Sequence, residues 1–258
     1  MKLTLRAIWI AIFLVTLAAC LPIMTPPPPI PSETAAPTET PTPTIVWFPP
    51  TPTYTPIPTS TAIGTPTVEA SPEHGALIFS DDFSDPAPWT LGRRQAGSAA
   101  LGKNELSIAV TQPKGYMFSI RPEPVLSDFY LEITASPSIC RGEDQYGLLL
   151  RFSSDANYYR FALTCDGRTR LDRIYQGNAS APQAPIYSAA VPPGAPSISR
   201  LAVQAKGKEM NFYINNEYQF TIRDGTLTKG SIGVFARAAG QDAMTVNFSD
   251  LAVYEIGE

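Results

Sequence analysis

The sequence predicts an all-β protein built from two packed antiparallel sheets. From Ala76 to Glu258 the chain consists of short apolar and β-branched runs, which Gly, Asn, Asp and Pro interrupt at intervals of roughly ten residues. No convincing amphipathic helix occurs in this region. The pattern predicts about thirteen strands, and a region with so many short strands buries its apolar side chains by packing one sheet on another.

The expected strands follow one another along the whole of this region. They are 76–79, 98–101, 105–110, 116–121, 129–135, 145–152, 157–165 and 169–175 and, after a Pro-rich loop, 200–206, 210–214, 218–223, 231–238 and 244–254. Between the strands 210–214 and 218–223 the turn contains Asn215 and Asn216, a residue type that tolerates positive φ.

Alternation of side chains predicts the buried face of each strand. In 145–152 we expect four residues to point into the core, namely Tyr146, Leu148, Leu150 and Phe152, and three to point outward, namely Gly147, Leu149 and Arg151. In 157–165 the expected inward set is Tyr159, Phe161, Leu163 and Cys165, and the outward set is Tyr158, Arg160, Ala162 and Thr164. Near the C-terminus the expected core positions are Leu201, Val203, Met210, Phe212, Ile214, Tyr218, Phe220 and Ile222.

The first two of these strands also predict a disulfide. A turn at 153–156 places residue 145 opposite residue 165, so a short loop returns Cys140 to Cys165. A bridge between these two cysteines is geometrically reasonable, and it would close a loop of about 25 residues.

The N-terminus has the pattern of an export signal. Lys2 and Arg6 precede an uncharged run over 7–19, whose helical length of about 20 Å is short for a hydrocarbon core of about 30 Å. The segment Leu17-Ala18-Ala19-Cys20 resembles the bacterial lipobox. This resemblance implies a diacylglycerol on Cys20 and a protein that is exported and lipid-anchored at the outer face of a bacterial membrane. The alternative is an ordinary signal peptide, with Cys20 an incidental thiol.

The segment 20–75 has the composition of a disordered stalk. Most of the 27 Pro of the chain fall here, among Thr and Ser, and the apolar residues are too sparse to offset the entropy of ordering the backbone. We therefore divide the chain into a lipoprotein signal peptide (1–19), a lipidated Cys with a Pro/Thr-rich stalk (20–75) and a β-sandwich domain (76–258). Trp47 and Phe48 interrupt the stalk; they either stack on neighbouring Pro rings or the membrane, or form a peptide ligand for an aromatic groove.

Composition excludes several classes of protein. The net charge of −4 offers no basic footprint for nucleic acid, so we expect no nucleic-acid partner. A single His, His74, removes most catalytic schemes that depend on imidazole.

Three segments carry a resemblance to a known family. The opening LIFSDDFSDPAPW, the late YINNEYQFTIRDGTLTKGSIGVFAR and the closing VNFSDLAVYEI resemble the concanavalin A-like lectin/glucanase superfamily in its laminin G-like form. The resemblance implies a jelly-roll sandwich whose last strand packs beside the first and whose concave face often binds glycans. Hydrolases share this fold, so the fold alone does not determine function.

The glucanase pattern Glu-x-Asp-x-x-Glu is absent. The departure from this motif favours a non-catalytic module that binds extracellular or cell-wall carbohydrate. Two alternatives stay open: a glycoside hydrolase or lyase that uses Asp144, Asp166 and Asp172 as unorthodox acids, and a protein-interaction module.

The candidate sugar-binding residues are Tyr and Arg side chains that point outward. Arg151, Tyr158 and Arg160 lie on adjacent expected strands, and Tyr213 and Arg237 point outward elsewhere. Aromatic faces suit the apolar side of a sugar ring, and charged groups suit its hydroxyls. The alternative is that these residues form an ordinary solvent face of a sheet.

A structural calcium is the candidate cofactor. Asp81 and Asp82, with Asp250 on the expected neighbouring last strand, could supply the hard oxygen ligands that Ca²⁺ prefers. The alternative is ordinary turn chemistry, which Asp85-Pro86 fits.

Overall fold

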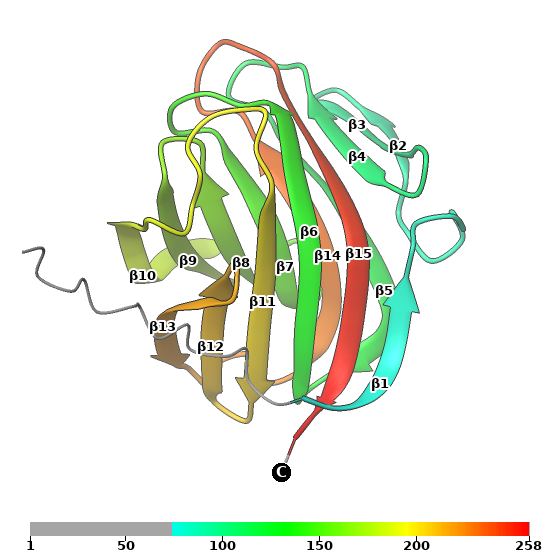
Figure 1. Ribbon diagram of the computed structural model, residues 1–258, viewed down its shortest axis with the longest axis vertical. Coiled ribbons are helices and arrows are strands. Elements are labelled where there is room, and N and C mark those ends of the chain that lie inside the picture. Colours follow the sequence, from blue (N-terminus) through cyan, green and yellow to red (C-terminus); the bar gives the residue numbers. More distant parts are fainter. Residues whose placement is uncertain (1–73, 258) are drawn as a thin grey trace, which may run out of the picture. The chain divides into compact units, whose positions relative to one another are not determined.

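A computed structural model describes residues 74–257, which form a two-layer β-sandwich (Figure 1). All of its regular elements are strands, as the sequence predicts, and within 74–257 no helix has the length and apolarity to cross a membrane. The signal peptide, Cys20, the stalk and the Trp47-Phe48 motif lie outside the described residues and stay predictions.

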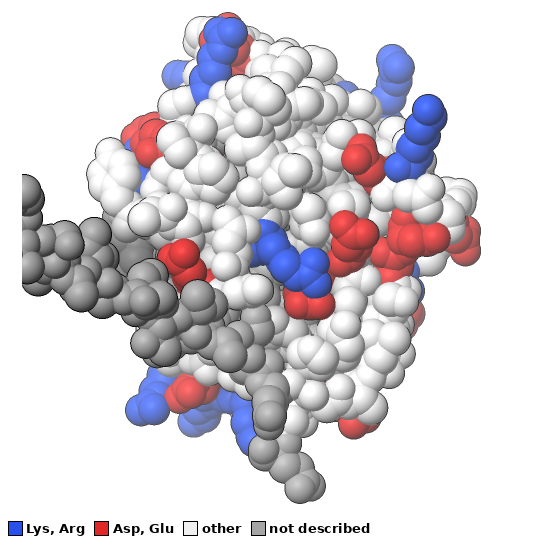
Figure 2. Space-filling view, viewed as in Figure 1, with Lys and Arg blue, Asp and Glu red and all other residues white. Residues whose placement is uncertain are grey.

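One layer is a nine-stranded sheet. Its order is β13 (Glu217–Arg223), β12 (Glu209–Ile214), β11 (Ser199–Lys206), β6 (Phe129–Ile139), β15 (Met244–Ile256), β4 (Leu106–Val110), β3 (Gly97–Leu101) and β2 (Gly92–Arg94), with β1 (His74–Asp81) also paired to β15. The pairing of β1 with β15 confirms that the last strand lies beside the first. Uncharged atoms cover most of the visible surface in the view onto this sheet (Figure 2).

The other layer is a six-stranded sheet. Its order is β10 (Asn178–Tyr187), β9 (Arg168–Tyr175), β8 (Asn157–Thr164), β7 (Gln145–Ser154), β14 (Gly230–Arg237) and β5 (Tyr116–Leu126). All strand pairs in both layers are antiparallel.

Each of the thirteen predicted strands is present, and the structure adds β2 and β10. We expected 178–187 to be a loop because it contains Pro182 and Pro185. The segment forms the edge strand β10, where a residue without an N–H is tolerated because one side of the strand needs no partner. The first strand begins at His74, two residues before the expected domain boundary, and the His74 ring stacks on Tyr254 with centroids 3.9 Å apart.

The core lies between the two sheets. Phe161 of β8 contacts Phe212 of β12, with ring centroids 4.8 Å apart, and so joins the two layers. The predicted alternation is confirmed along β8, where Tyr159, Phe161 and Leu163 are fully buried in this core. In β13, however, Tyr218 is 44% exposed, because a register shift after Phe212 changes the face on which it lies.

The alternation expected along β7 is wrong after Leu150. A bulge between Leu150 and Ser154 places Arg151 at a φ of 49°. Phe152 consequently turns to the outer face of the sheet, while the expected outward residue Arg151 is fully buried.

The buried guanidinium of Arg151 therefore links three separate connecting segments by hydrogen bonds. It donates hydrogen bonds to the carbonyl oxygens of Leu227 at 2.9 Å, Ser127 at 3.1 Å and Gly207 at 2.9 Å. The prediction that Arg151 contacts a sugar is wrong for this physical reason.

The predicted disulfide and the predicted Asn turn are both present. Cys140 and Cys165 form a disulfide with their Cα atoms 5.7 Å apart, and both are buried. Gln145 pairs with Thr164, one residue from the expected partner. Asn215 and Asn216 adopt φ values of 51° and 66° between β12 and β13.

Candidate functional site

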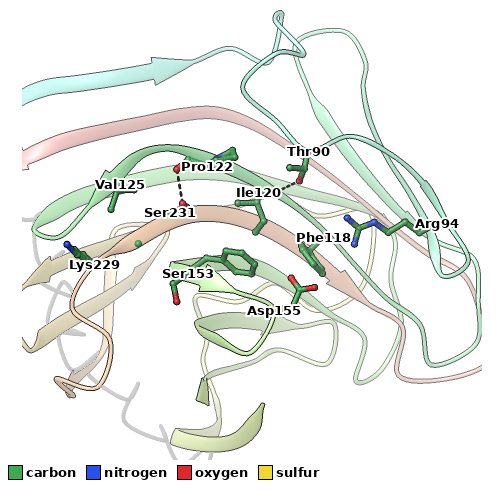
Figure 3. A pocket seen from close by; sticks show the side chains of 12 residues that line it. Thr90, Arg94, Phe118, Ile120, Pro122, Val125, Ser153, Asp155, Lys229 and Ser231 are labelled. Carbon is green, nitrogen blue, oxygen red and sulfur yellow. Dashed lines mark hydrogen bonds between the residues drawn. The ribbon is translucent and has the colours of Figure 1, made fainter. Parts of the chain in front are cut away.

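A groove of about 550 Å³ lies on the outer face of the six-stranded sheet (Figure 3). This volume is in the range of small-molecule sites. The groove is lined by Thr90, Arg94, Phe118, Ile120, Pro122, Val125, Phe152, Ser153, Asp155, Lys229, Gly230 and Ser231.

The floor of the groove is apolar, and its side chains come from β5 and β7, the two strands on either side of β14. Phe118 and Ile120 lie two residues apart on β5, so they share a face, and Phe152 reaches the same face from β7. Ring centroids of Phe118 and Phe152 are 6.1 Å apart. The bulge at Arg151 is what places the second ring in the groove.

Gly230 allows the strands to approach at this bulge. A Cβ built on Gly230 would lie 2.3 Å from the carbonyl carbon of Arg151, which is too close for any side chain. Glycine is therefore required where β14 passes β7, beneath the groove.

Three charged side chains stand on the rim, and all three are exposed. Arg94 comes from β2, Asp155 from the turn between β7 and β8, and Lys229 from the residue before β14. The guanidinium carbon of Arg94 lies 5.2 Å from the centroid of Phe118, a cation–π distance. Asp155 is the one carboxylate among the groove-lining residues.

Hydrogen bonds hold the rim against the floor. Thr90 Oγ1 accepts a hydrogen bond from the backbone N–H of Ile120 at 2.8 Å, and Ser119 Oγ donates to the carbonyl of Thr90 at 2.9 Å. Ser231 Oγ donates to the carbonyl of Pro122 at 2.7 Å. The loop before β2 and the start of β14 are thus fixed relative to β5, so the groove is formed before any ligand binds.

An aromatic strip continues from the groove across the sheet. Tyr158 stacks on Phe152 at 5.5 Å, Tyr116 lies 5.6 Å from Phe118, and Phe235 lies 5.7 Å from Tyr116. Burial raises the pKa of Tyr116 well above its usual value, so its phenol stays protonated into the alkaline range.

Beside the strip lies an ionic cluster of Asp172 with two arginines. Arg160 and Arg170 both pair with the buried Asp172, and Arg160 lies 5.7 Å from the ring centroids of Tyr116 and Phe235. Burial lowers the pKa of Arg160, but the charge and hydrogen bonds of Asp172 outweigh it, and the net shift is upward. Arg160 is therefore a cation held in place beside the aromatic strip.

The structure brings only some of the predicted sugar-binding residues together. Tyr158 and Arg160 lie on the grooved face, next to the groove but not in its lining. Arg237 is on the same sheet, paired in register with Tyr116. Tyr213 belongs to β12 in the other sheet, so it shares no site with these three.

Sequence reasoning missed the residues that line the groove. Phe118 and Ile120 alternate with buried residues in the predicted strand 116–121, and this alternation was a signal for a second apolar face. Phe152 was assigned to the core because a bulge has no signature in simple alternation. Arg94, Asp155 and Lys229 meet only through folding.

The carboxylates proposed for calcium have other partners. Asp81 accepts hydrogen bonds from the backbone N–H of Phe83, from Trp89 Nε1 and from Arg121. Asp82 accepts from Ser84 and Asn104, and Asp250 accepts from Ser249. Over residues 74–257 no group of three or more His, Cys, Asp or Glu is placed to hold a metal, and the structural calcium stays a prediction.

The acids considered for catalysis also have structural partners. Asp144 is buried and accepts from the backbone N–H groups of Arg141 and Ala239. Asp166 pairs with Arg168, and Asp172 pairs with two arginines. Neither Asp144 nor Asp166 lies in the groove.

Comparison with known proteins finds similarity in structure but not in sequence. No protein-family profile and no curated protein matches the sequence. Among solved structures, carbohydrate binding module CBM66 from Bacillus subtilis is similar over 65% of this chain and 96% of its own, with 18% identity and a TM-score of 0.53. A Bacillus subtilis protein of unknown function with a galectin-like fold is similar over 72% of this chain and 99% of its own, with 16% identity and a TM-score of 0.55.

A catalytic domain shares the same architecture. The endo-1,3-beta-glucanase (laminarinase) domain from Thermotoga petrophila is similar over 70% of this chain and 98% of its own, with 9% identity and a TM-score of 0.51. These identities show the fold alone. The chain is thus an antiparallel jelly-roll β-sandwich, a fold class that includes both carbohydrate-binding modules and glycoside hydrolases.

Proposed function

We propose that this protein binds carbohydrate, without hydrolysing it, in the groove on the six-stranded sheet. The observation that carries the proposal is a preformed apolar floor of Phe118 and Phe152 with charged side chains on its rim. Aromatic rings bind the C–H faces of sugars, and the rim side chains can hydrogen bond to hydroxyls that surround those faces. Carbohydrate binding by structural relatives with the same sandwich is consistent with this proposal.

Absence of a second acid in the groove favours binding over hydrolysis. Glycoside hydrolysis ordinarily needs two carboxylates on opposite sides of the scissile bond. Asp155 is the one carboxylate in the lining, and the neighbouring Asp172 is buried between arginines.

The sequence supports a membrane location for the module. We propose that a diacylglycerol on Cys20 anchors the chain at the outer face of a bacterial membrane and that 21–75 carries the sandwich away from it. Mass spectrometry of the N-terminal peptide tests the modification, and C20A should release the protein from the membrane fraction. An unmodified Cys20 would refute the anchor but leave the groove proposal intact.

A glycan and polysaccharide array of the purified protein tests the binding function. For every glycan that the parent protein binds on the array, we expect Phe118→Ala and Phe152→Ala each to weaken binding by about tenfold, because each variant removes one aromatic stacking surface. Tyr218→Ala is the matched control, since Tyr218 is an exposed aromatic on the other sheet. Thermal unfolding with and without calcium tests the proposed cofactor.

Three results would contradict these proposals. A folded protein that binds no glycan would refute carbohydrate binding, and saturable binding to a purified protein instead would favour an interaction module. Release of shorter sugars from a bound polysaccharide would refute the non-catalytic assignment. An unfolding temperature that is the same with and without calcium would refute the predicted structural calcium.

A further inference from the structure

We propose that the groove selects an anionic glycan, a sugar chain that bears carboxylate or sulfate groups; this inference rests on the proposed carbohydrate-binding function. Its basis is the charge of the rim. Arg94 and Lys229 contribute two positive charges and Asp155 one negative charge, so the groove is positive by one unit. The chain as a whole carries a net charge of −4, which makes a positive groove a local feature.

The two cations of the groove have no ionic partner in the described part of the chain. Most of the arginines on the six-stranded sheet lie in salt bridges, as Arg160 and Arg170 do with Asp172 and Arg173 does with Asp224. Within 74–257, Arg94 and Lys229 belong to no salt bridge. An anion that enters the groove therefore need not displace an existing carboxylate.

Arg94 is also positioned to receive an acidic group. Its guanidinium carbon lies over the Phe118 ring, which restricts the side chain while leaving its N–H groups available. A planar guanidinium can donate two parallel hydrogen bonds to a carboxylate or sulfate. A sugar that stacks on the apolar floor of the groove would thus place one of its ring substituents beside the guanidinium of Arg94.

The positions of the charges suggest how such a chain lies. Arg94 and Lys229 are at opposite ends of the groove, and Asp155 lies along one side, nearer to the Arg94 end (Figure 3). Asp155 would repel an acidic group next to it but can accept hydrogen bonds from hydroxyls. We infer that the acidic groups lie beside Arg94 and Lys229 and that an uncharged hydroxyl faces Asp155.

Matched pairs of glycans test the inference with the full chain. An oligogalacturonate is compared with its methyl ester, and a sulfated oligosaccharide with its desulfated form, by calorimetric titration. We expect the acidic member of at least one pair to bind tenfold or more tightly than its neutral partner, and we expect added salt to reduce this difference. The pair that shows the difference identifies the acidic group.

Variants locate the effect in the groove. Arg94→Met and Lys229→Met keep an apolar stem and remove the charge, and each should reduce the preference for the acidic glycan severalfold. Arg93→Met is the control, because Arg93 is the exposed neighbour on β2 and does not line the groove. All three residues are exposed, so we expect each variant to fold.

The outcomes separate this inference from the proposed function. Equal binding of acidic and neutral partners would overturn anion selection while leaving carbohydrate binding in place. An acidic preference that survives Arg94→Met and Lys229→Met would also overturn it. If no glycan of either kind binds, the proposed function fails and the inference fails with it.

Discussion

Arg160 donates two hydrogen bonds to one carboxylate oxygen of Asp172, from Nε at 3.1 Å and from Nη2 at 2.7 Å. Arg170 donates to the other oxygen, so both oxygens of a nearly fully buried carboxylate are satisfied by arginines. This cluster joins β8 to β9 next to the aromatic strip. The cluster therefore stabilises the pairing of two strands and also holds the neighbouring part of the grooved face in place.

Asp172→Asn is expected to destabilise the domain strongly. The substitution leaves two partly buried guanidinium groups without their counter-ion, a loss that costs roughly 3 kcal/mol when a buried pair is broken. Asp242→Asn, which breaks the exposed pair with Arg141, should cost less than about 1 kcal/mol. Urea unfolding monitored by fluorescence measures both; equal effects would contradict a special role for Asp172.

Arg151→Met is expected to destabilise the chain and to weaken ligand binding together. The variant leaves three carbonyl oxygens without their donor in a buried site, at a cost of about 3 kcal/mol. It also loosens the bulge that turns Phe152 into the groove. Thermal unfolding and glycan titration of the same sample test the link. A stable variant with unchanged affinity would show that the bulge does not depend on Arg151.

Removal of the disulfide is expected to lower stability by roughly 3 kcal/mol. Cys140 and Cys165 are 25 residues apart, and a cross-link of this length restricts the unfolded chain by about that amount. The double variant Cys140→Ala with Cys165→Ala, measured by denaturant unfolding, tests this value. Both cysteines are buried, so reductant should act on the native protein far more slowly than on unfolded chain. A stability equal to that of the parent would contradict the prediction.

Folding stability is expected to fall in alkaline solution. Burial raises the pKa of Tyr159 from 10.0 to about 12. Because the unfolded chain loses this proton first, the contribution of Tyr159 is fully present below pH 10 and is lost as the pH rises toward 12.

Tyr159→Phe tests this alkaline sensitivity. We expect the variant to lose less stability than the parent when urea unfolding is compared at neutral pH and at about pH 11. The parent should also show a larger rise in tyrosinate absorbance near pH 12 than the variant. Identical pH profiles for the two proteins would contradict the assignment.

Local patterns predicted most of the fold because a sheet repeats every two residues. Along β8 the inward set of Tyr159, Phe161 and Leu163 follows directly from this period. The Cys140–Cys165 bridge follows from the same hairpin, since its partners are close in sequence. β10 escaped prediction because its Pro residues suit a loop as well as an edge strand.

The candidate site was predictable only in part. The sequence placed Tyr158 and Arg160 on an outward face, and the structure confirms that face for both. The sequence could not show that Tyr158 and Arg160 are largely buried by aromatic neighbours and by Asp172. The burial of a side chain on the outer face depends on its cross-strand partners.

The sequence by itself determined thirteen of the fifteen strands in residues 74–257, the two-sheet architecture and the disulfide, because each depends on short-range periodicity and spacing. Only the tertiary structure decided where a ligand can bind. A single bulge moved Arg151 inward and Phe152 outward, and three distant segments brought Arg94, Asp155 and Lys229 to one rim. Such positions depend on register and on contacts between loops far apart in the chain, and no local pattern encodes them.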